Sequence, residues 1–444
     1  MSSVPGPVLS RIYIALQRLV NLRAGEGIAL FWAFSYFFAL MCSYYILRPM
    51  RDEMGIAGGV DRLHWLFTGT FVVMLAVVPV FGWVTTRFPR KRFLPYVYYF
   101  FIANILVFYA LFESHVTHAY IARAFFIWVS VFNLFVVSVF WSFMADIFHD
   151  LQAKRLFGFI AAGGTVGALV GPALTTFLVV PLGTTNMLLI SAALLGWAIL
   201  SIRKLANWRL LSEPDAETRR QESGRQERPL AGGLLDGVIL VLRSPYLLGI
   251  CVLMLLFTML ATFLYFEQAY IIRAHFADSN ERTAVFAAMD LAVNGLTILM
   301  QVFFTGRLIN RLGLSWTLAL LPILLGVGFL VLGLAPELGV LIVVQVLRRA
   351  GNYAVMRPAR EVLYVLLGRE EKYKAKNFID TVVYRGGDAL SAWGYSGLHA
   401  LGLGLGHIAF LAVPLSMLWA WVAYRLGKKQ MAMAADTANA ANTR

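Results

Sequence analysis

The chain has 444 residues, of which 59% are hydrophobic and only 14% are charged. A soluble globular domain is about 45–50% apolar and about 25% charged, so this composition excludes a soluble protein and predicts an integral membrane protein. The formal net charge of +14 does not indicate a nucleic-acid partner, because the basic residues cluster in short loops between apolar runs, as positive-inside topology requires.

The sequence lacks the motifs that bind metal ions or hydrolyse nucleotides. The two cysteines, Cys42 and Cys251, lie in apolar runs, and the seven histidines include neither an HExxH motif nor an i,i+4 pair. No G-x-x-x-x-G-K-[ST] loop is present. We therefore expect no metal, no cofactor and no enzymatic activity.

The N-terminal segment, residues 1–26, has apolar residues at helical spacing with arginines between them. The apolar positions are Val8, Leu9, Ile12, Leu16, Leu19 and Val20, and the arginines are Arg11, Arg18 and Arg23. This pattern predicts an amphipathic helix on the cytoplasmic membrane surface and not a cleaved signal.

Twelve apolar runs are long enough to cross about 30 Å of hydrocarbon. They lie at roughly 27–50, 63–86, 91–112, 119–147, 155–181, 184–205, 240–272, 283–308, 314–335, 338–366, 376–403 and 407–426. A polar break from Glu213 to Pro229 separates six from six. We expect an all-α membrane protein with six-helix bundles at 27–207 and 239–427, a cytoplasmic linker at 208–238 and a cytoplasmic tail at 428–444.

Lysine and arginine are concentrated in alternate loops. The basic loops are 87–92, 154–155, the linker, 307–311, 369–376 and 428–429. This alternation predicts that both termini are cytoplasmic and that the protein is a multi-pass protein of the bacterial inner membrane.

The two halves are weakly similar to each other. Gly82-Trp-Val-Thr-Thr-Arg-Phe-Pro-Arg-Lys, after the second span, matches Gly306-Arg-Leu-Ile-Asn-Arg-Leu-Gly, after the eighth. Both resemble the G-x-x-x-D-R-x-G-R-R loop of the major facilitator superfamily, with Thr86 and Asn310 in place of the aspartate. The resemblance implies two bundles that rock about a central substrate site.

A duplicated pentad is the sharpest charged pattern: Arg48-Pro-Met-Arg-Asp52 in span one and Arg357-Pro-Ala-Arg-Glu361 in span ten. In each, the first arginine and the acid are i,i+4 and able to pair. One interpretation is a set of salt bridges that hold the halves together at each face. The other is a pair of arginine forks for a phosphate or carboxylate substrate, and the two are compatible.

Further polar residues interrupt the spans of the second half. Span seven contains Glu267; span eight has a stripe of Asp290, Asn294, Thr297 and Gln301; span ten adds Arg348, Arg349 and Asn352; span eleven contains Asp380 and Arg385, which can reach Asp388. Each charge at bilayer depth costs about 2.5–3.5 kcal/mol, so these faces must point inward. They either line a water-filled cavity or form hydrogen bonds between helices.

Span five contains Gly163, Gly164, Gly167 and Gly171-Pro172. This ladder of small residues predicts a close helix–helix contact. It is also similar to the glycine–proline motif of major facilitator antiporters.

The stretch from Val340 to Tyr395 resembles the ATP:ADP antiporter family, the nucleotide transporters of plastids and intracellular bacteria. The residues that match as they stand are Arg349, Tyr353, Pro358, Glu361, Lys374, Lys376, Ile379, Asp380, Arg385 and Gly387. Arg360 and Arg51 occupy lysine positions of the family, and Asp146 and Glu267 occupy its acidic positions. The resemblance implies that Arg51, Asp146, Glu267 and Arg360 act in nucleotide exchange. Asn352, Arg357 and Asp388 depart from the family pattern.

We therefore expect a monomeric secondary transporter that moves an organic anion, such as a nucleotide, by alternating access. A bound anion would neutralise Arg51 and Arg360, which an empty, closing cavity would leave without counter-charges. An alternative is a proton-coupled symporter or exporter of another solute, with Asp290, Asp380, Asp388 or Glu267 as the proton carrier. A multi-span enzyme that acts on a lipid-linked substrate, or a membrane sensor, is a further alternative.

Overall fold

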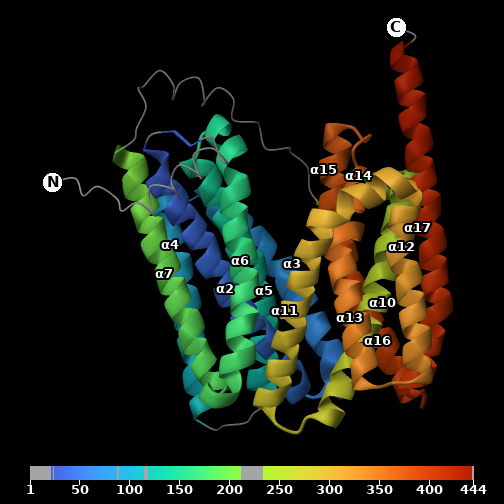
Figure 1. Cartoon of the computed structure of the whole chain (residues 1–444), viewed down its shortest axis with the longest axis horizontal. Helices are drawn as coiled ribbons and strands as arrows, with labels where there is room; N and C mark the ends of the chain where they lie inside the picture. Colours follow the sequence, from blue (N-terminus) through green and yellow to red (C-terminus); the bar gives the residue numbers. More distant parts are fainter. Residues whose placement is uncertain (1–21, 24, 88–89, 115–118, 212–233, 443–444) are drawn as a thin grey trace. The chain divides into compact units, whose positions relative to one another are not determined.

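A computed structural model describes residues 22–23, 25–87, 90–114, 119–211 and 234–442 (Figure 1). These residues form helices and turns without a strand. Eleven helices among them are long and apolar enough to cross a membrane. The predicted amphipathic helix and most of the predicted linker lie outside the described residues.

The helices of the first predicted half follow the apolar runs. They are α2 (Glu26–Ala57), the short η1 (Val60–Arg62), α3 (Leu63–Arg87), α4 (Arg90–Glu113), α5 (Ala119–Ile147), α6 (Asp150–Leu182) and α7 (Thr184–Leu211). Prolines inside α2, α3, α4 and α6 do not end these helices, because neighbouring groups in a membrane bundle can satisfy the backbone that proline frees.

The second predicted half contains more interruptions. Its elements are α9 (Leu234–Arg243), α10 (Pro245–His275), α11 (Ser279–Phe303), α12 (Thr305–Leu334), α13 (Leu338–Gly351), η2 (Asn352–Met356), α14 (Arg357–Val362), α15 (Arg369–Phe378), η3 (Ile379–Val383), α16 (Tyr384–Ala400) and α17 (Leu405–Asn442). Both η2 and η3 are π-helical turns. The predicted span 376–403 is the one outside the eleven, because Asp380, Arg385 and Asp388 lie within its apolar run.

The described residues group into two compact units. The first unit contains α2 up to Asp52, α3 from Val77, and α4 to α7. The second unit contains Glu53–Ala76, which are the last turn of α2, η1 and the first part of α3, together with α9 to α17.

Side-chain contacts explain why Glu53–Ala76 belongs to the second unit. The Tyr270 hydroxyl donates to Asp61 Oδ1 at 2.9 Å. The Trp393 indole donates to Thr68 Oγ1 at 3.1 Å. His64 Nδ1 lies 3.0 Å from Ser396 Oγ, and these contacts attach η1 and α3 to α10 and α16.

In the first unit, the glycine ladder of α6 packs against the backbone of α2. A Cβ atom added at Gly163 would lie 2.5 Å from the Phe34 carbonyl oxygen, and one at Gly171 would lie 2.7 Å from that of Cys42. At Gly167 an added Cβ would overlap the Phe38 carbonyl oxygen. The predicted close helix–helix contact is therefore confirmed.

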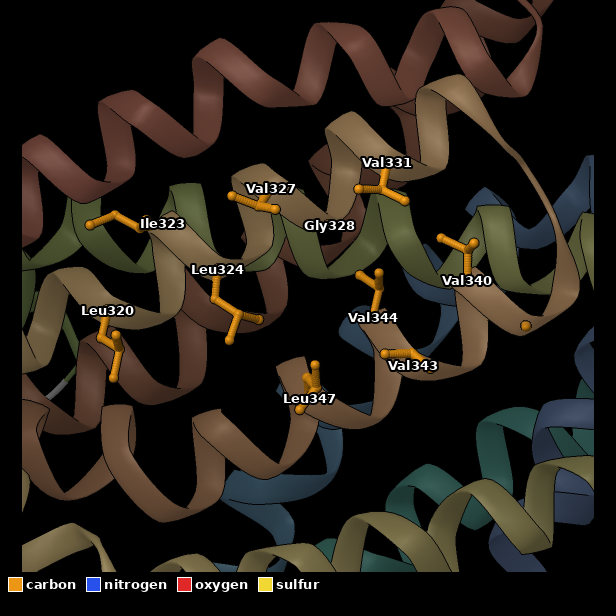
Figure 2. Close-up of a pocket in the computed structure, with 11 residues that line it drawn as sticks. Leu320, Ile323, Leu324, Val327, Gly328, Val331, Val340, Val343, Val344 and Leu347 are labelled. Atoms are coloured by element: carbon orange, nitrogen blue, oxygen red, sulfur yellow. The ribbon is translucent and has the colours of Figure 1, made fainter.

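An apolar groove of about 620 Å³ lies between α12 and α13 in the second unit (Figure 2). Aliphatic side chains of the two helices, among them Leu324, Val331 and Val344, line it together with two glycines. The groove has no polar side chain to recognise a charged solute, so we look for the functional site elsewhere.

Candidate anion-binding site

A buried ion pair joins α13 to α11. Arg349 Nη2 donates to Asp290 Oδ1, with 9% of the Arg349 side chain and 1% of the Asp290 side chain exposed. Asn294, one turn further along α11, is also buried. For Asp290, the interpretation as an interhelical contact is confirmed.

Arg348, the neighbouring residue on α13, bonds one amide side chain, which in turn bonds a second. Its Nε donates to Gln345 Oε1 at 2.8 Å, and Gln345 Nε2 donates to Gln268 Oε1 of α10. All three side chains are buried. Gln345 and Gln268 are not among the predicted site residues, although a polar side chain inside an apolar run indicates a face that points away from lipid.

The π-turn η2 follows α13 directly and carries two candidate residues of the predicted site, Asn352 and the family-matching Tyr353. A π-turn leaves carbonyl groups without their usual partners. Thr305 Oγ1 donates to the Ala354 carbonyl at 2.8 Å, and Gln301 Nε2 donates to the Tyr353 carbonyl at 3.5 Å. Side chains from α11 and α12 thus support η2.

Arg360 of α14 and Asp380 of η3 form the second arginine–acid pair of this unit, with Nη2 and Oδ1 3.3 Å apart. Arg360 Nη1 also contacts Met254 Sδ at 2.8 Å. The buried Arg360 Nε donates no hydrogen bond to any described residue. A guanidinium held this way retains a donor for an oxyanion.

The predicted pairing of Arg357 with Glu361 is wrong. Glu361 Oε2 accepts from Lys376 Nζ of α15 at 2.6 Å, while Arg357 is exposed. Figure 1 shows α14 and α15 at the same end of the second unit, which makes this pairing across helices possible. The long, flexible side chain of Lys376 therefore reaches the Glu361 carboxylate from a neighbouring helix, and Arg357, four residues before Glu361, does not pair with it.

A polar cavity of about 420 Å³ opens beside this pair. It is lined by Gln301, Tyr353, Arg357, Pro358 and Glu361. Two residues of the predicted site, Arg357 and Glu361, therefore share one cavity wall with the π-turn. Its mixture of a guanidinium, a carboxylate, an amide and an aromatic ring suits a polar anion with a planar group.

Two further predicted residues of the second unit lie on α16 and α10. Arg385 Nη1 is 3.6 Å from Asp388 Oδ2, so the predicted contact between them is confirmed. Thr262 Oγ1 of α10 lies 3.5 Å from Asp388 Oδ1. Glu267 is fully buried; its Oε1 accepts from the Tyr395 hydroxyl at 3.5 Å, and its Oε2 has no hydrogen-bond partner among the described residues.

The predicted residues of the first unit lie on α2 and α5. Arg51 Nη2 donates to Asp52 Oδ1 at 2.6 Å, and the guanidinium lies 5.0 Å from the centre of the Phe126 ring. The Arg48 guanidinium lies 5.6 Å from the Tyr45 ring centre. Asp146 is half-buried near the end of α5.

These pairings correct one expectation. Each arginine has a carboxylate partner within the chain: Arg51 pairs with Asp52, and Arg360 pairs with Asp380. The expectation that an empty site leaves both arginines without counter-charges is therefore wrong. A cargo anion would have to compete with these carboxylates.

Comparison with known proteins agrees with this fold of apolar helices and buried charge. The sequence matches the Major Facilitator Superfamily over residues 29–371. The chain therefore belongs to this superfamily, and it is a multi-pass membrane transporter.

Its relatives include ADP,ATP carrier protein 1 of Chlamydia muridarum, which is 23% identical over 474 aligned positions that cover 90% of this chain and 88% of the relative. The protein of the same name from Chlamydia trachomatis has the same identity and coverage. The match to the ATP:ADP antiporter family expected from the stretch Val340–Tyr395 is thereby confirmed.

Solved structures share the fold. A POT family transporter in complex with a thioalcohol-conjugated peptide has a TM-score of 0.63 and 12% identity, covering 90% of this chain and 96% of that chain. The nucleoside transporter NupG has a TM-score of 0.57 and 13% identity, covering 93% of this chain and 99% of that chain.

Proposed function

We propose that this transporter exchanges organic anions of the nucleotide type across the bacterial inner membrane. The relatives named as ADP,ATP carrier proteins support this cargo class. The observation that carries the proposal is the polar cavity lined by Arg357 and Glu361, one turn from the Arg360–Asp380 pair. Phosphates suit arginine because its planar donors bind oxyanions in a bidentate manner.

The proposed cargo contacts combine the resemblance with the geometry. Arg360 would bind a phosphate through Nε, which donates no hydrogen bond to the described residues. Tyr353, which lines the polar cavity with Arg357 and Glu361, offers an aromatic ring against which a base can stack. Arg51 and Asp146 of the first unit and Glu267 of the second retain the roles that the family resemblance implies.

The proposal also includes the architecture and the setting. We propose six-helix halves at 27–207 and 239–427, cytoplasmic termini and a monomeric protein in the lipid bilayer. The basic loops between apolar helices support this orientation.

Exchange is tested in proteoliposomes. Vesicles preloaded with unlabelled ADP should take up labelled ATP faster than empty vesicles, and Arg360→Ala should abolish this uptake. Equal uptake by preloaded and empty vesicles would argue against exchange. No uptake of any nucleotide would argue against the cargo class.

A second candidate function is proton-coupled transport of another solute, and Glu267 is the residue that favours it. Glu267 is a carboxylate with no exposure and one weak, neutral donor, so the protein provides little stabilisation for its negative charge. Uptake that collapses when a protonophore is added would support this candidate over exchange.

A further inference from the structure

A buried ion pair that sequence analysis did not find lies in the second unit, at the last turn of α2. Arg282 donates from Nε to Glu53 Oε2 at 2.6 Å and from Nη2 to Glu53 Oε1 at 2.7 Å. Glu53 is fully buried, and only 13% of the Arg282 side chain is exposed. This bidentate geometry is the strongest arrangement of an arginine and a carboxylate.

Arg282 is fixed on its other side as well. Its Nη1 donates to the carbonyl oxygens of Phe276 at 2.9 Å and of Ala277 at 2.8 Å, both in the connection between α10 and α11. Asp278 caps the first turn of α11 by accepting from the backbone of Asn280 and Glu281. The guanidinium therefore binds the end of α2 to a rigid turn of the second unit.

The pair lies where the chain passes from one compact unit to the other. The helix α2 is continuous, yet Asp52 belongs to the first unit and Glu53 to the second. The weaker contacts of Asp61, His64 and Thr68 with α10 and α16 follow on η1 and α3. All of these contacts lie at the face that the loop charges predict to be outside.

We propose that Glu53 and Arg282 form a gate, which is closed in this structure and must open for the transporter to face the outside. In the predicted halves, α2 and α3 belong to the first bundle and α10, α11 and α16 to the second. Rocking of the bundles would therefore have to separate Glu53 from Arg282. The contacts of Asp61, His64 and Thr68 contribute less, because none of them joins two opposite charges in a bidentate manner.

The gate is also adjacent to a proposed cargo residue. Arg51, paired with Asp52, lies two residues before Glu53 on the same helix. An anion that draws Arg51 away from Asp52 acts within one helical turn of the gate. This step rests on the proposed function, whereas the existence of the gate does not.

A distance measurement tests the gate without any cargo. Spin labels are placed at Ala57→Cys and Glu281→Cys, both exposed positions within one turn of the pair, in a Cys42→Ala/Cys251→Ala background. Glu53→Gln should raise the ratio of long to short label distances at least about tenfold, because removing one partner of a buried pair destabilises the closed form strongly. An unchanged distribution would overturn the proposal. Glu337→Gln, which removes an exposed acid on the same predicted face, should leave the distribution unchanged.

A cross-link tests the same gate with Glu53 and Arg282 intact. A short bis-methanethiosulfonate reagent forms a disulfide with each of the cysteines at 57 and 281 and releases sulfinate at each step. This cross-link in the same cysteine variant should stop exchange, and reduction should restore it. Exchange at the same rate in the locked and reduced protein would overturn the proposal. Tyr99→Cys/Arg203→Cys, at exposed positions whose side chains meet at 2.7 Å within the first unit, should cross-link without loss of exchange. If the reduced protein exchanges no nucleotide, the cargo assignment fails and the distance measurement alone decides on the gate.

Discussion

At the scale of single residues, two ion pairs of the second unit differ chiefly in burial. Asp290 and Arg349 are 1% and 9% exposed, whereas Glu361 and Lys376 are 45% and 32% exposed. Removing one partner of a buried pair leaves a charge without compensation and costs about 3–5 kcal/mol. An exposed pair contributes about 0–1 kcal/mol, because water and salt screen it.

We therefore expect Asp290→Ala to lower the free energy of unfolding by about 3–5 kcal/mol and Glu361→Ala by less than about 1 kcal/mol. Thermal unfolding in detergent measures both. The double variant Asp290→Leu/Arg349→Met should recover much of the loss, because apolar residues can replace a buried pair. Similar losses for Asp290→Ala and Glu361→Ala would contradict this ranking.

Local spacing predicted some of these contacts and missed others. Arg385 and Asp388 were predicted correctly because residues three apart on a helix are neighbours. The same rule failed for Glu361, whose partner Lys376 comes from another helix. Glu53 and Arg282 are 229 residues apart, and a single sequence contains no spacing signal for such a pair.

At the scale of helices and turns, the glycines of α6 provide a prediction with an internal control. Gly167→Leu should destabilise the first unit, because any side chain there overlaps the backbone of α2. Gly158→Leu, on the same helix, should have little effect, because an added Cβ there has no other atom within 4 Å. The thermal midpoint in detergent should fall by several degrees for Gly167→Leu only. A comparable fall for both variants would argue against close packing as the cause.

The π-turn η2 gives a second prediction at this scale. One extra residue in a helical turn rotates everything after it by about 100°, so η2 sets the direction of Arg357 and Arg360. Thr305→Val removes the donor to the Ala354 carbonyl. It should weaken nucleotide binding several-fold, and Thr305→Ser should restore it.

A ligand thermal-shift titration measures this change in affinity. Thr176→Val is the control, because Thr176 donates only to the Pro172 carbonyl of its own helix in the first unit. Equal affinity in Thr305→Val and the unaltered protein would show that η2 does not depend on this donor.

The positions of the membrane-spanning helices could be predicted well from the sequence, but the π-turns could not. Apolar runs of sufficient length correspond to eleven helices among the described residues. A π-turn leaves hydropathy unchanged, since it adds one residue without altering composition. Its position depends on donors such as Gln301 and Thr305 from other elements.

At the scale of the whole molecule, Asp380 affects the ratio of exchange to net transport. Asp380 supplies Arg360 with a counter-charge from within the chain, so closure of an empty carrier need not leave this arginine uncompensated. The pair should permit some return of the empty carrier and hence some net transport. Cargo and Asp380 are then competitors for the same guanidinium.

Asp380→Asn should therefore make exchange more nearly obligatory. The variant leaves Arg360 without an acid partner when no anion is bound, which penalises closure of the empty carrier. Because Asp380 is 33% exposed, we expect a change of about 1 kcal/mol, which corresponds to about a fivefold higher ratio of exchange to net uptake. Uptake of labelled nucleotide by preloaded and by empty proteoliposomes gives this ratio directly. Glu337→Gln should leave the ratio unchanged, and an equal loss of both kinds of uptake in Asp380→Asn would show that Asp380 serves the cargo itself and not the empty carrier.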